Sequence, residues 1–266
     1  MIRFDNVVKR LGGRNVLDGV SFEVRKGEVL ALAGPSGTGK SVTLKHIVGL
    51  MVPSSGRVFV DGAEVSAARG RGLEAVRGKI GYLFQGGALL GWLTVRENVE
   101  LPLRERTSLP EREIARRAQE ALEAVDLADA AEKYPSEISG GMTKRAGLAR
   151  AIVRSADIIL YDEPTSGLDP VTALAINRLV KRVNRRFGTT SVVVTHDIQQ
   201  ALMFADRVML LKDGKVCAVD APERFVASEL PAVREFLAAQ FISPGDWGKI
   251  RESAESLGLD GNGGVG

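Results

Sequence analysis

The chain has 266 residues, of which 44% are apolar and 26% are charged, and its formal net charge is only +3. This composition is typical of a globular protein with a large core, and the charge gives no electrostatic support for a nucleic-acid-binding role. No apolar run approaches the roughly 18 residues that a membrane-spanning helix needs, and residues 1–5 lack the layout of a signal peptide. The single cysteine, Cys217, cannot form an internal disulfide, which fits a reducing cytosol.

Short strands and turns are predicted for the first part of the chain. The predicted strands occupy residues 2–9, 20–24, 29–33, 57–60 and 79–84. Asp61-Gly62 follows the fourth strand as a tight turn, and Gln85 directly follows the fifth.

A glycine-rich motif follows the apolar strand at residues 29–33. Its residues are Gly34, Pro35, Ser36, Gly37, Thr38, Gly39, Lys40 and Ser41, which match G-x-x-x-x-G-K-[ST], and a helix is predicted after them at residues 42–50. Such a loop turns backbone N–H groups inward around an anion, and the helix N-terminus adds partial positive charge. We therefore expect Lys40 to reach the β- and γ-phosphates of a nucleotide and the Ser41 hydroxyl to ligate Mg²⁺.

The pattern becomes helical from about residue 86 to residue 154. Ser108-Leu109-Pro110-Glu111 predicts a capped helix start, after which Ile114, Ala118, Ala121, Leu122 and Val125 fall on one helical face. Strand–helix alternation resumes at Asp157. Because such alternation implies a mostly parallel α/β core, the helical region is predicted to be an insertion that forms a second lobe.

Two carboxylates end the apolar strand at residues 158–161. Asp162 would lie beside the phosphate loop, as ligands do at the carboxyl edge of open α/β sheets, and would hold Mg²⁺ through water. Glu163 is then placed to polarise a water that attacks the γ-phosphate. A strand-end Asp-Glu pair is usually just solvated, but the phosphate loop earlier in the chain favours the functional interpretation.

Two further segments have two interpretations each. His196, after a predicted strand at residues 191–195, either senses the γ-phosphate or caps the following helix. Ser139, Gly140 and Gly141 precede a helix predicted at residues 143–153, and form either a second anion site or a plain helix cap. Since one ATP needs one phosphate loop, a second anion site would serve a nucleotide held by another copy of the chain.

The last third of the chain adds one helix, one hairpin and a helical end. Asp169 and Pro170 predict the start of a helix that runs to about residue 187. Predicted strands at residues 207–211 and 215–219 flank the hairpin signal Asp213-Gly214. A helical segment follows, and residues 258–266 are predicted to be disordered.

Together these segments resemble the ATP-binding cassette (ABC) ATPase family over residues 1–225. The motifs appear in family order: Walker A at residues 34–41, the Q-loop at Gln85, the signature at Ser139-Gly140-Gly141, Walker B ending in Asp162-Glu163, the D-loop at Ser166-Gly167-Leu168-Asp169, and the switch His196. The resemblance implies a P-loop NTPase (RecA-like) α/β core with a mostly parallel sheet, an N-terminal antiparallel β subdomain and an inserted α-helical subdomain. The expected ABC domain covers residues 1–230, with its core at 1–85 and 156–225 and its helical subdomain at 86–155, and a C-terminal extension covers 231–266.

The family resemblance also implies roles for individual residues. It implies a head-to-tail dimer around two ATPs, in which each Walker A faces the signature of the partner. Glu163, His196 and Gln85 would be catalytic, and Ser41, Gln85 and Asp162 would hold Mg²⁺. The residues implied to contact ATP are the Walker A residues 34–41, Val42, Leu11, Ser139, Gly140, Gly141 and Asp169. The sequence departs from the family at Met142, usually glutamine, and at Leu11, where an aromatic residue usually stacks on adenine.

A narrower resemblance is to the ATPases of Mla/Mce-type lipid transport systems. It rests on residues 83–89, 98–99, 101–105 and 139–146, where Met142 and the basic pair after it match this branch. It implies an ATPase on the cytoplasmic face of the inner (plasma) membrane that drives a permease for phospholipid or other hydrophobic cargo, with an Mce-domain lipid-binding protein as partner. Candidate permease contacts, which could equally be core residues of the small lobe, are Leu89, Leu90, Trp92 and Leu93.

Three alternative functions keep the same motifs. The cassette could serve another transporter, such as an amino-acid importer or a lipoprotein-release system. It could be an ABC-type ATPase of DNA repair or translation, although those usually carry two cassettes or a long coiled-coil insertion. It could be an unrelated P-loop kinase, which the signature segment and the D-loop argue against.

Overall fold

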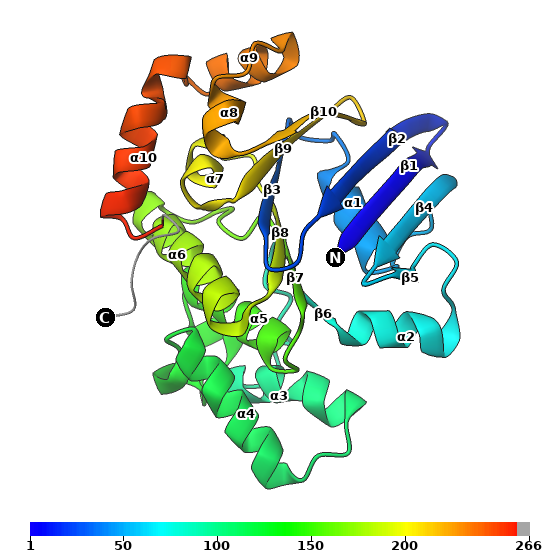
Figure 1. The fold of residues 1–266 in the computed structure, drawn as a ribbon. Coiled ribbons are helices and arrows are strands. Elements are labelled where there is room, and N and C mark those ends of the chain that lie inside the picture. Colours follow the sequence, from blue (N-terminus) through cyan, green and yellow to red (C-terminus); the bar gives the residue numbers. More distant parts are fainter. Residues whose placement is uncertain (260–266) are drawn as a thin grey trace. The chain divides into compact units, whose positions relative to one another are not determined.

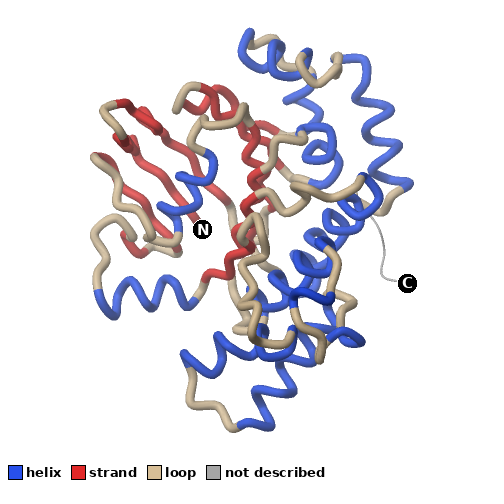
Figure 2. The backbone as a smooth tube through the Cα atoms, turned by 180° about the vertical axis from the view of Figure 1, so that it is seen from behind, coloured by secondary structure: helices blue, strands red, loops and turns tan. Residues whose placement is uncertain are grey.

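The computed structural model describes residues 1–259, and these divide into two compact units. Unit 1 combines residues 1–77 with the chain from residue 190 onward, and unit 2 comprises residues 78–189. Figures 1 and 2 show the two units from opposite sides. Disorder is predicted for residues 258–266, of which 260–266 lie outside the described residues. At Leu259 the prediction is wrong, because this residue is buried and its N–H donates to Ala254 O at 2.9 Å. None of the helices formed by residues 1–259 combines the length and the apolar character needed to cross a membrane.

Unit 1 contains an antiparallel sheet with the strand order β2-β1-β4-β5, drawn in blue and cyan in Figure 1. Its strands are β1 (Ile2–Leu11), β2 (Arg14–Val24), β4 (Ser55–Val60) and β5 (Ala63–Glu64). The rings of Phe4 and Phe22 stack across β1 and β2, with centroids 4.6 Å apart. Asp61 and Gly62 have φ values of 49° and 79°, the left-handed pair that a two-residue hairpin turn requires, so the predicted turn is confirmed.

The parallel strands of unit 1 carry the phosphate loop. Strand β3 (Val29–Ala33) lies between β8 (Thr190–Val194) and β9 (Arg207–Lys212) and runs parallel to both, while β10 (Lys215–Asp220) pairs antiparallel with β9. Every residue of β3 is buried, as an apolar run in a central strand predicts. Helices α1 (Lys40–Ile47) and α7 (Ile198–Phe204) pack against these strands.

Three helices follow the β9–β10 hairpin and belong to the same core. They are α8 (Pro222–Val226), α9 (Pro231–Ala238) and α10 (Trp247–Ser256), the last preceded by the short 3₁₀ helix η3 (Pro244–Asp246), and Figure 1 draws them in orange and red. Their apolar residues form one cluster with β3, α7 and β9. The members from the three helices are Phe225, Val226, Val233, Phe236, Leu237 and Ile250. Residues 231–250 are therefore packed into unit 1.

Unit 2 consists of two parallel strands and most of the helices drawn in green in Figure 1. The strands are β6 (Ile80–Leu83) and β7 (Ile158–Asp162), and the helices are α3 (Val95–Arg106), α4 (Glu111–Ala124), α5 (Gly140–Ile152) and α6 (Pro170–Phe187), with the 3₁₀ turns η1 (Ala128–Ala130) and η2 (Pro135–Glu137). Helix α2 (Gly70–Gly78) ends where this unit begins. Helices α3, α4 and α5 pack on one another. The predicted fold, an α/β core with an antiparallel N-terminal part and inserted helices, is confirmed.

Three predicted helix ends differ from the structure. Helix α4 begins after Pro110, not at a capping box on Ser108, because Pro110 is extended (φ −67°, ψ 152°) and a proline disfavours helical backbone in the residue before it. A capping box occurs instead at the start of α3, between Thr94 and Glu97. Helix α5 begins at Gly140 rather than residue 143, and α1 ends at Ile47 rather than residue 50.

Candidate functional site

The phosphate loop occupies the turn from β3 into α1 in unit 1, and two of its glycines are required by space. A Cβ on Gly34 would lie 2.1 Å from the carbonyl oxygen of Leu211, and a Cβ on Gly39 would lie 2.7 Å from Leu17 Cδ2. Both glycines also have positive φ, 151° and 102°, which other residues rarely adopt. The loop between them, residues 35–37, is exposed. Glycine thus lets the loop lie tightly on the strands while its middle faces outward.

The side chain of Lys40 lies inside this loop and contacts its backbone. It is buried, and Nζ donates to the carbonyl oxygens of Gly34 and Pro35, each at 2.8 Å. The ammonium therefore lies within the loop, next to the N-terminus of α1, where Ser41 is the second helical residue. A fixed cation, a glycine-rich loop and a helix N-terminus together form a site that fits a polyphosphate.

His196 leaves the same sheet edge as the phosphate loop. Strand β8 runs beside β3 with Val194 opposite Leu32, and the Thr195 N–H donates to Leu32 O at 3.2 Å. The side chain of His196 is exposed, and Asp197, rather than His196, caps α7 by accepting from Gln200 N. The capping interpretation of His196 is therefore wrong.

The other two predicted nucleotide contacts in unit 1 lie on different elements. Leu11 ends β1 at the tip of the hairpin and is exposed, so it offers apolar surface without an aromatic ring. Val42 is half-buried on α1.

Unit 2 brings Gln85, Asp162 and Glu163 together at the carboxyl ends of β6 and β7. Gln85 Nε2 donates to Glu163 Oε2 at 3.2 Å and lies 3.4 Å from Ser166 Oγ. The Tyr82 hydroxyl donates to Asp162 Oδ2 at 3.1 Å. Burial and the neighbouring Asp162 raise the pKa of Tyr82 well above its usual value, so this phenol remains a donor. Each carboxylate is thus held by a specific neutral donor.

The signature residues form the first turn of α5. Ser139 is the N-cap, and its Oγ accepts from Met142 N at 3.3 Å, while Ser139 and Gly140 are exposed. Gly141 is buried, and it has no room for a side chain, since a Cβ there would lie 2.6 Å from Thr172 Cγ2. The helix begins at two exposed residues and has no acidic residue in its first turn, so its N-terminus can receive an anion.

Asp169 is the N-cap of α6, as the sequence predicted. It caps α6 by accepting from Val171 N at 3.0 Å and Thr172 N at 3.1 Å. The Thr172 hydroxyl also donates to it, and this bond, followed by the backbone donors, lowers the pKa of Asp169. The carboxylate is therefore ionised as a cap, and contact with a nucleotide stays a prediction.

Three polar residues of unit 2 escaped the sequence analysis as site residues: Tyr82, Lys144 and Asn98. Lys144, on α5, donates from Nζ to the backbone oxygen of Glu163 at 3.3 Å. Asn98 is fully buried on α3 and holds the loop at residues 90–94 through its amide. Asn98 and Lys144 lie in the segments of the narrower resemblance, but nothing in the sequence indicates their contacts, and Tyr82 has no signal beyond a polar group in a short strand.

The oxygen donors suit Mg²⁺ that arrives with a nucleotide. Within residues 1–259, no group of three or more His, Cys, Asp or Glu side chains is arranged to hold a metal. Mg²⁺ bound with phosphates usually takes only one or two carboxylates, and Asp162 in unit 2 is a donor of that kind.

The sequence profile of the ABC transporter family matches residues 17–166. The chain therefore belongs to the ABC transporter family, as an ATP-hydrolysing cassette. It is 40% identical over 244 residues to the intermembrane phospholipid transport system ATP-binding protein MlaF of Haemophilus influenzae, which covers 92% of each chain. It is also 40% identical over 243 residues to the probable ribonucleotide transport ATP-binding protein mkl of Mycobacterium tuberculosis, covering 91% of this chain and 68% of that one.

A solved structure supports the same conclusion. The dimeric post-hydrolysis state of the ATP-binding cassette MJ0796, bound to ADP and Pi, aligns with a TM-score of 0.76 and 37% identity. The alignment covers 84% of this chain and 99% of that one. The predicted family and ATPase activity are thereby confirmed.

Proposed function

We propose that the chain is the ATPase subunit of a transporter that moves phospholipid or another hydrophobic cargo between membranes. The observation that carries this proposal is the similarity to MlaF along 92% of both chains. The marks of the narrower resemblance include Met142 and Asn98, and Asn98 has a defined structural task here.

The hydrolytic step follows from the donors described above. The phosphate loop binds the triphosphate, and Lys40 neutralises its charge. Ser41, Asp162 and Gln85 would hold Mg²⁺, which would supply further charge neutralisation. Glu163 accepts a proton from the attacking water, while the Gln85 amide fixes the direction of that carboxylate. His196 donates to the γ-phosphate.

Two copies of the chain complete each ATP site. The exposed start of α5, at Ser139 and Gly140, suits the γ-phosphate of an ATP held by the phosphate loop of a second copy. The dimeric state of the MJ0796 cassette supports this arrangement. ATP binding would favour the closed dimer, and hydrolysis would release it.

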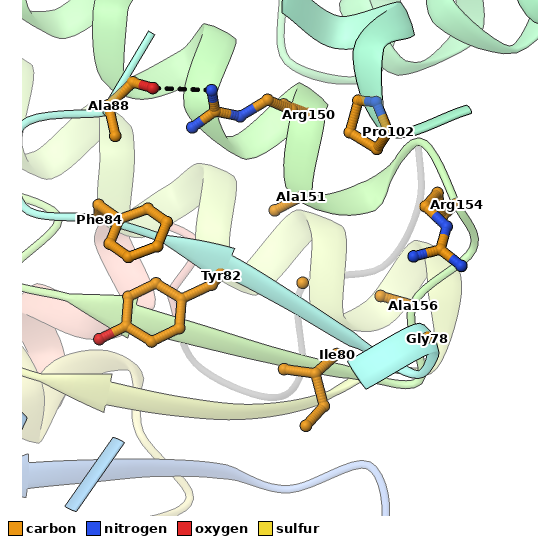
Figure 3. Close-up of a pocket in the computed structure, with 11 residues that line it drawn as sticks. Gly78, Ile80, Tyr82, Phe84, Ala88, Pro102, Arg150, Ala151, Arg154 and Ala156 are labelled. Carbon is orange, nitrogen blue, oxygen red and sulfur yellow. Dashed lines mark hydrogen bonds between the residues drawn. The ribbon is translucent and has the colours of Figure 1, made fainter. Parts of the chain in front are cut away.

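A pocket of unit 2 suits a cytoplasmic segment of a permease. Its volume is about 330 Å³, and β6, the chain after it, α3 and the end of α5 line it. Figure 3 shows Phe84 beside Tyr82, Arg150 above them, and Arg154 at the far side of the pocket, beyond Pro102. The rings of Phe84 and Tyr82 stack with centroids 4.2 Å apart, and Phe84 is 40% exposed. Arg150 donates to the backbone oxygens of Ala88 and Gly87, each at 2.8 Å. The exposed ring of Phe84 and the cation of Arg154 can therefore receive a helix end that carries a carboxylate.

The apolar residues predicted as permease contacts lie outside the lining of this pocket. Trp92 is 74% exposed, while Leu89, Leu90 and Leu93 are half-buried. Trp92 remains a candidate contact. Docking on the permease would hold the cassette at the cytoplasmic face of the inner membrane, with an Mce-domain protein as the further partner.

The decisive experiment is purification of the intact complex through this chain, followed by lipid mass spectrometry and an ATP-driven lipid-transfer assay between vesicles. We expect co-purified phospholipid and transfer that Lys40→Ala abolishes. The similarity to mkl makes ribonucleotide a second candidate cargo. ATP-dependent uptake of labelled ribonucleotide without lipid transfer would replace the lipid proposal and leave the ATPase assignment intact.

A further inference from the structure

Lys144 is a buried cation with a specific contact. It lies on α5 one helical turn after Gly140, and it is only 5% exposed. Its Nζ donates to the backbone oxygen of Glu163 at 3.3 Å, and that oxygen also accepts from Ser166 N at 3.2 Å. The segment after β7 is thus tied to the signature helix by one side chain.

The surroundings explain why a lysine is tolerated there. Burial lowers the pKa of Lys144, and the carboxylates of Glu163 and Asp162 counteract this effect. A buried ammonium is costly unless charges and hydrogen bonds compensate it. Methionine would fill a similar volume without that cost, so the ammonium indicates a task beyond packing.

The backbone of Glu163 is the part that needs support. Its φ is 49°, in the left-handed region that is strained for a residue other than glycine. The donor on Lys144 stabilises the carbonyl orientation of this conformation. The conformation in turn sets the direction of the side chain that Gln85 contacts.

We propose that Lys144 is a positioning residue that couples the two ATP sites of the dimer. This inference rests on the proposed sandwich of two copies. In that dimer the first turn of α5 binds the ATP held by the partner, while Lys144, about 6 Å further along the same rigid helix, holds Glu163 of the other ATP site. A shift of α5 on binding or loss of the partner's phosphate therefore moves the donor that orients Glu163.

The test uses the intact transporter complex with three substitutions. Lys144→Met removes the donor and charge at similar volume, Lys144→Gln keeps an N–H donor without charge, and Lys144→Arg keeps both. ATPase rates are measured against ATP concentration, together with melting temperature and ATP affinity. Lys249→Met, on an exposed lysine of α10, is the matched control.

We expect the wild type and Lys249→Met to show a Hill coefficient above 1 for ATP. Lys144→Met should lower it to about 1 and reduce kcat about tenfold, with ATP affinity and melting temperature little changed. Lys144→Arg should restore both values. An unchanged Hill coefficient in Lys144→Met, or failure of Lys144→Arg to restore it, overturns the proposal. If Lys144→Met does not fold, Lys144→Gln decides the matter: because it keeps a donor, it should retain a Hill coefficient above 1, and a coefficient of about 1 overturns the proposal.

Glu163→Gln in the same assay distinguishes a failure of the proposed function from a failure of the coupling role of Lys144. If this variant hydrolyses ATP at the wild-type rate, the assignment of Glu163 as the base is wrong. If it stalls while Lys144→Met is indistinguishable from wild type, only the coupling role of Lys144 fails.

Discussion

The hydroxyl of Tyr82 on β6 donates a hydrogen bond to Oδ2 of Asp162 at the end of β7, 3.1 Å away. The ring of Tyr82 also stacks on Phe84, which lines the pocket of Figure 3. One side chain therefore contacts both the carboxylate proposed to hold Mg²⁺ and the surface proposed to receive a permease.

Tyr82→Phe should weaken Mg²⁺ binding while keeping the stacked ring. Loss of a hydrogen bond that orients a metal-binding carboxylate typically costs about tenfold or more in metal affinity. The measurement is a Mg²⁺ titration of ATP binding and of ATPase activity, with Tyr134→Phe, on an exposed tyrosine, as control. A half-saturating Mg²⁺ concentration equal to that of the wild type would contradict this role.

Glu163→Gln should bind ATP and stop hydrolysing it. Removing a general base typically lowers the rate by about 10²-fold to 10⁴-fold. ATP-bound dimer should accumulate, which size-exclusion chromatography with light scattering detects. Glu132→Gln, an exposed glutamate of the helical region, should retain normal turnover.

Asn98→Ala should destabilise the loop at residues 90–94. The amide accepts from Leu90 N at 2.7 Å and donates to the carbonyl oxygens of Leu90, Leu93 and Thr94. Since these partners would lose buried hydrogen bonds, we expect a loss of about 3 kcal/mol in the free energy of unfolding, measured by urea denaturation. Gln199→Ala, at an exposed position, should change it by less than about 0.5 kcal/mol. Equal effects from the two substitutions would contradict the proposed role of Asn98 in holding this loop.

The free energy of unfolding should be lower at mildly acidic pH because of His46. The ring is 1% exposed, Nδ1 donates to Val42 O at 2.7 Å, and Nε2 finds no partner among residues 1–259. Burial lowers its pKa, the Val42 hydrogen bond opposes this, and the Lys9 charge adds to the lowering.

The sign of the effect follows from proton uptake. Below about pH 6.5 the unfolded chain protonates this histidine more readily than the folded chain, so folding is favoured less as pH falls. We expect up to about 1 kcal/mol lower stability at pH 5.5 than at pH 7.5 from this residue. Urea denaturation of His46→Leu should lack this component, and an unchanged pH slope would contradict the assignment.

Phe84→Ala should uncouple the cassette from its permease. The exposed ring supplies the apolar surface of the pocket, and loss of an aromatic anchor typically costs about 2 kcal/mol in binding. Co-purification with the membrane subunit and stimulation of ATPase activity by it should both fall. Phe241→Ala, on an exposed ring of unit 1, should leave both intact. Normal co-purification of Phe84→Ala would place the permease elsewhere.

Local chemistry explains which features the sequence predicts. The hairpin turns at Asp61-Gly62 and Asp213-Gly214 and the helix start at Asp169 depend on neighbouring residues, and all three are found. The helix start predicted at Ser108 is wrong, because Pro110 is extended and the helix begins after it.

Contacts made by pairing of distant elements were not predictable in the same way. Tyr82 meets Asp162 only because β6 pairs in register with β7, and Lys144 meets Glu163 only because α5 packs beside that strand end. A polar residue in a helix or strand does not by itself indicate which residue it contacts.

The apolar cluster of the C-terminal helices also contains Ala31 and Ala33 of β3, the strand that leads into the phosphate loop. A protein engineer who trims this cassette to a minimal catalytic fragment at residue 230 would remove Val233, Phe236 and Ile250 from that cluster. The remaining fragment would expose apolar surface next to β3 and would tend to aggregate. Affinity tags and fluorescent fusions therefore belong after residue 259, and a shortened expression clone should keep all three helices.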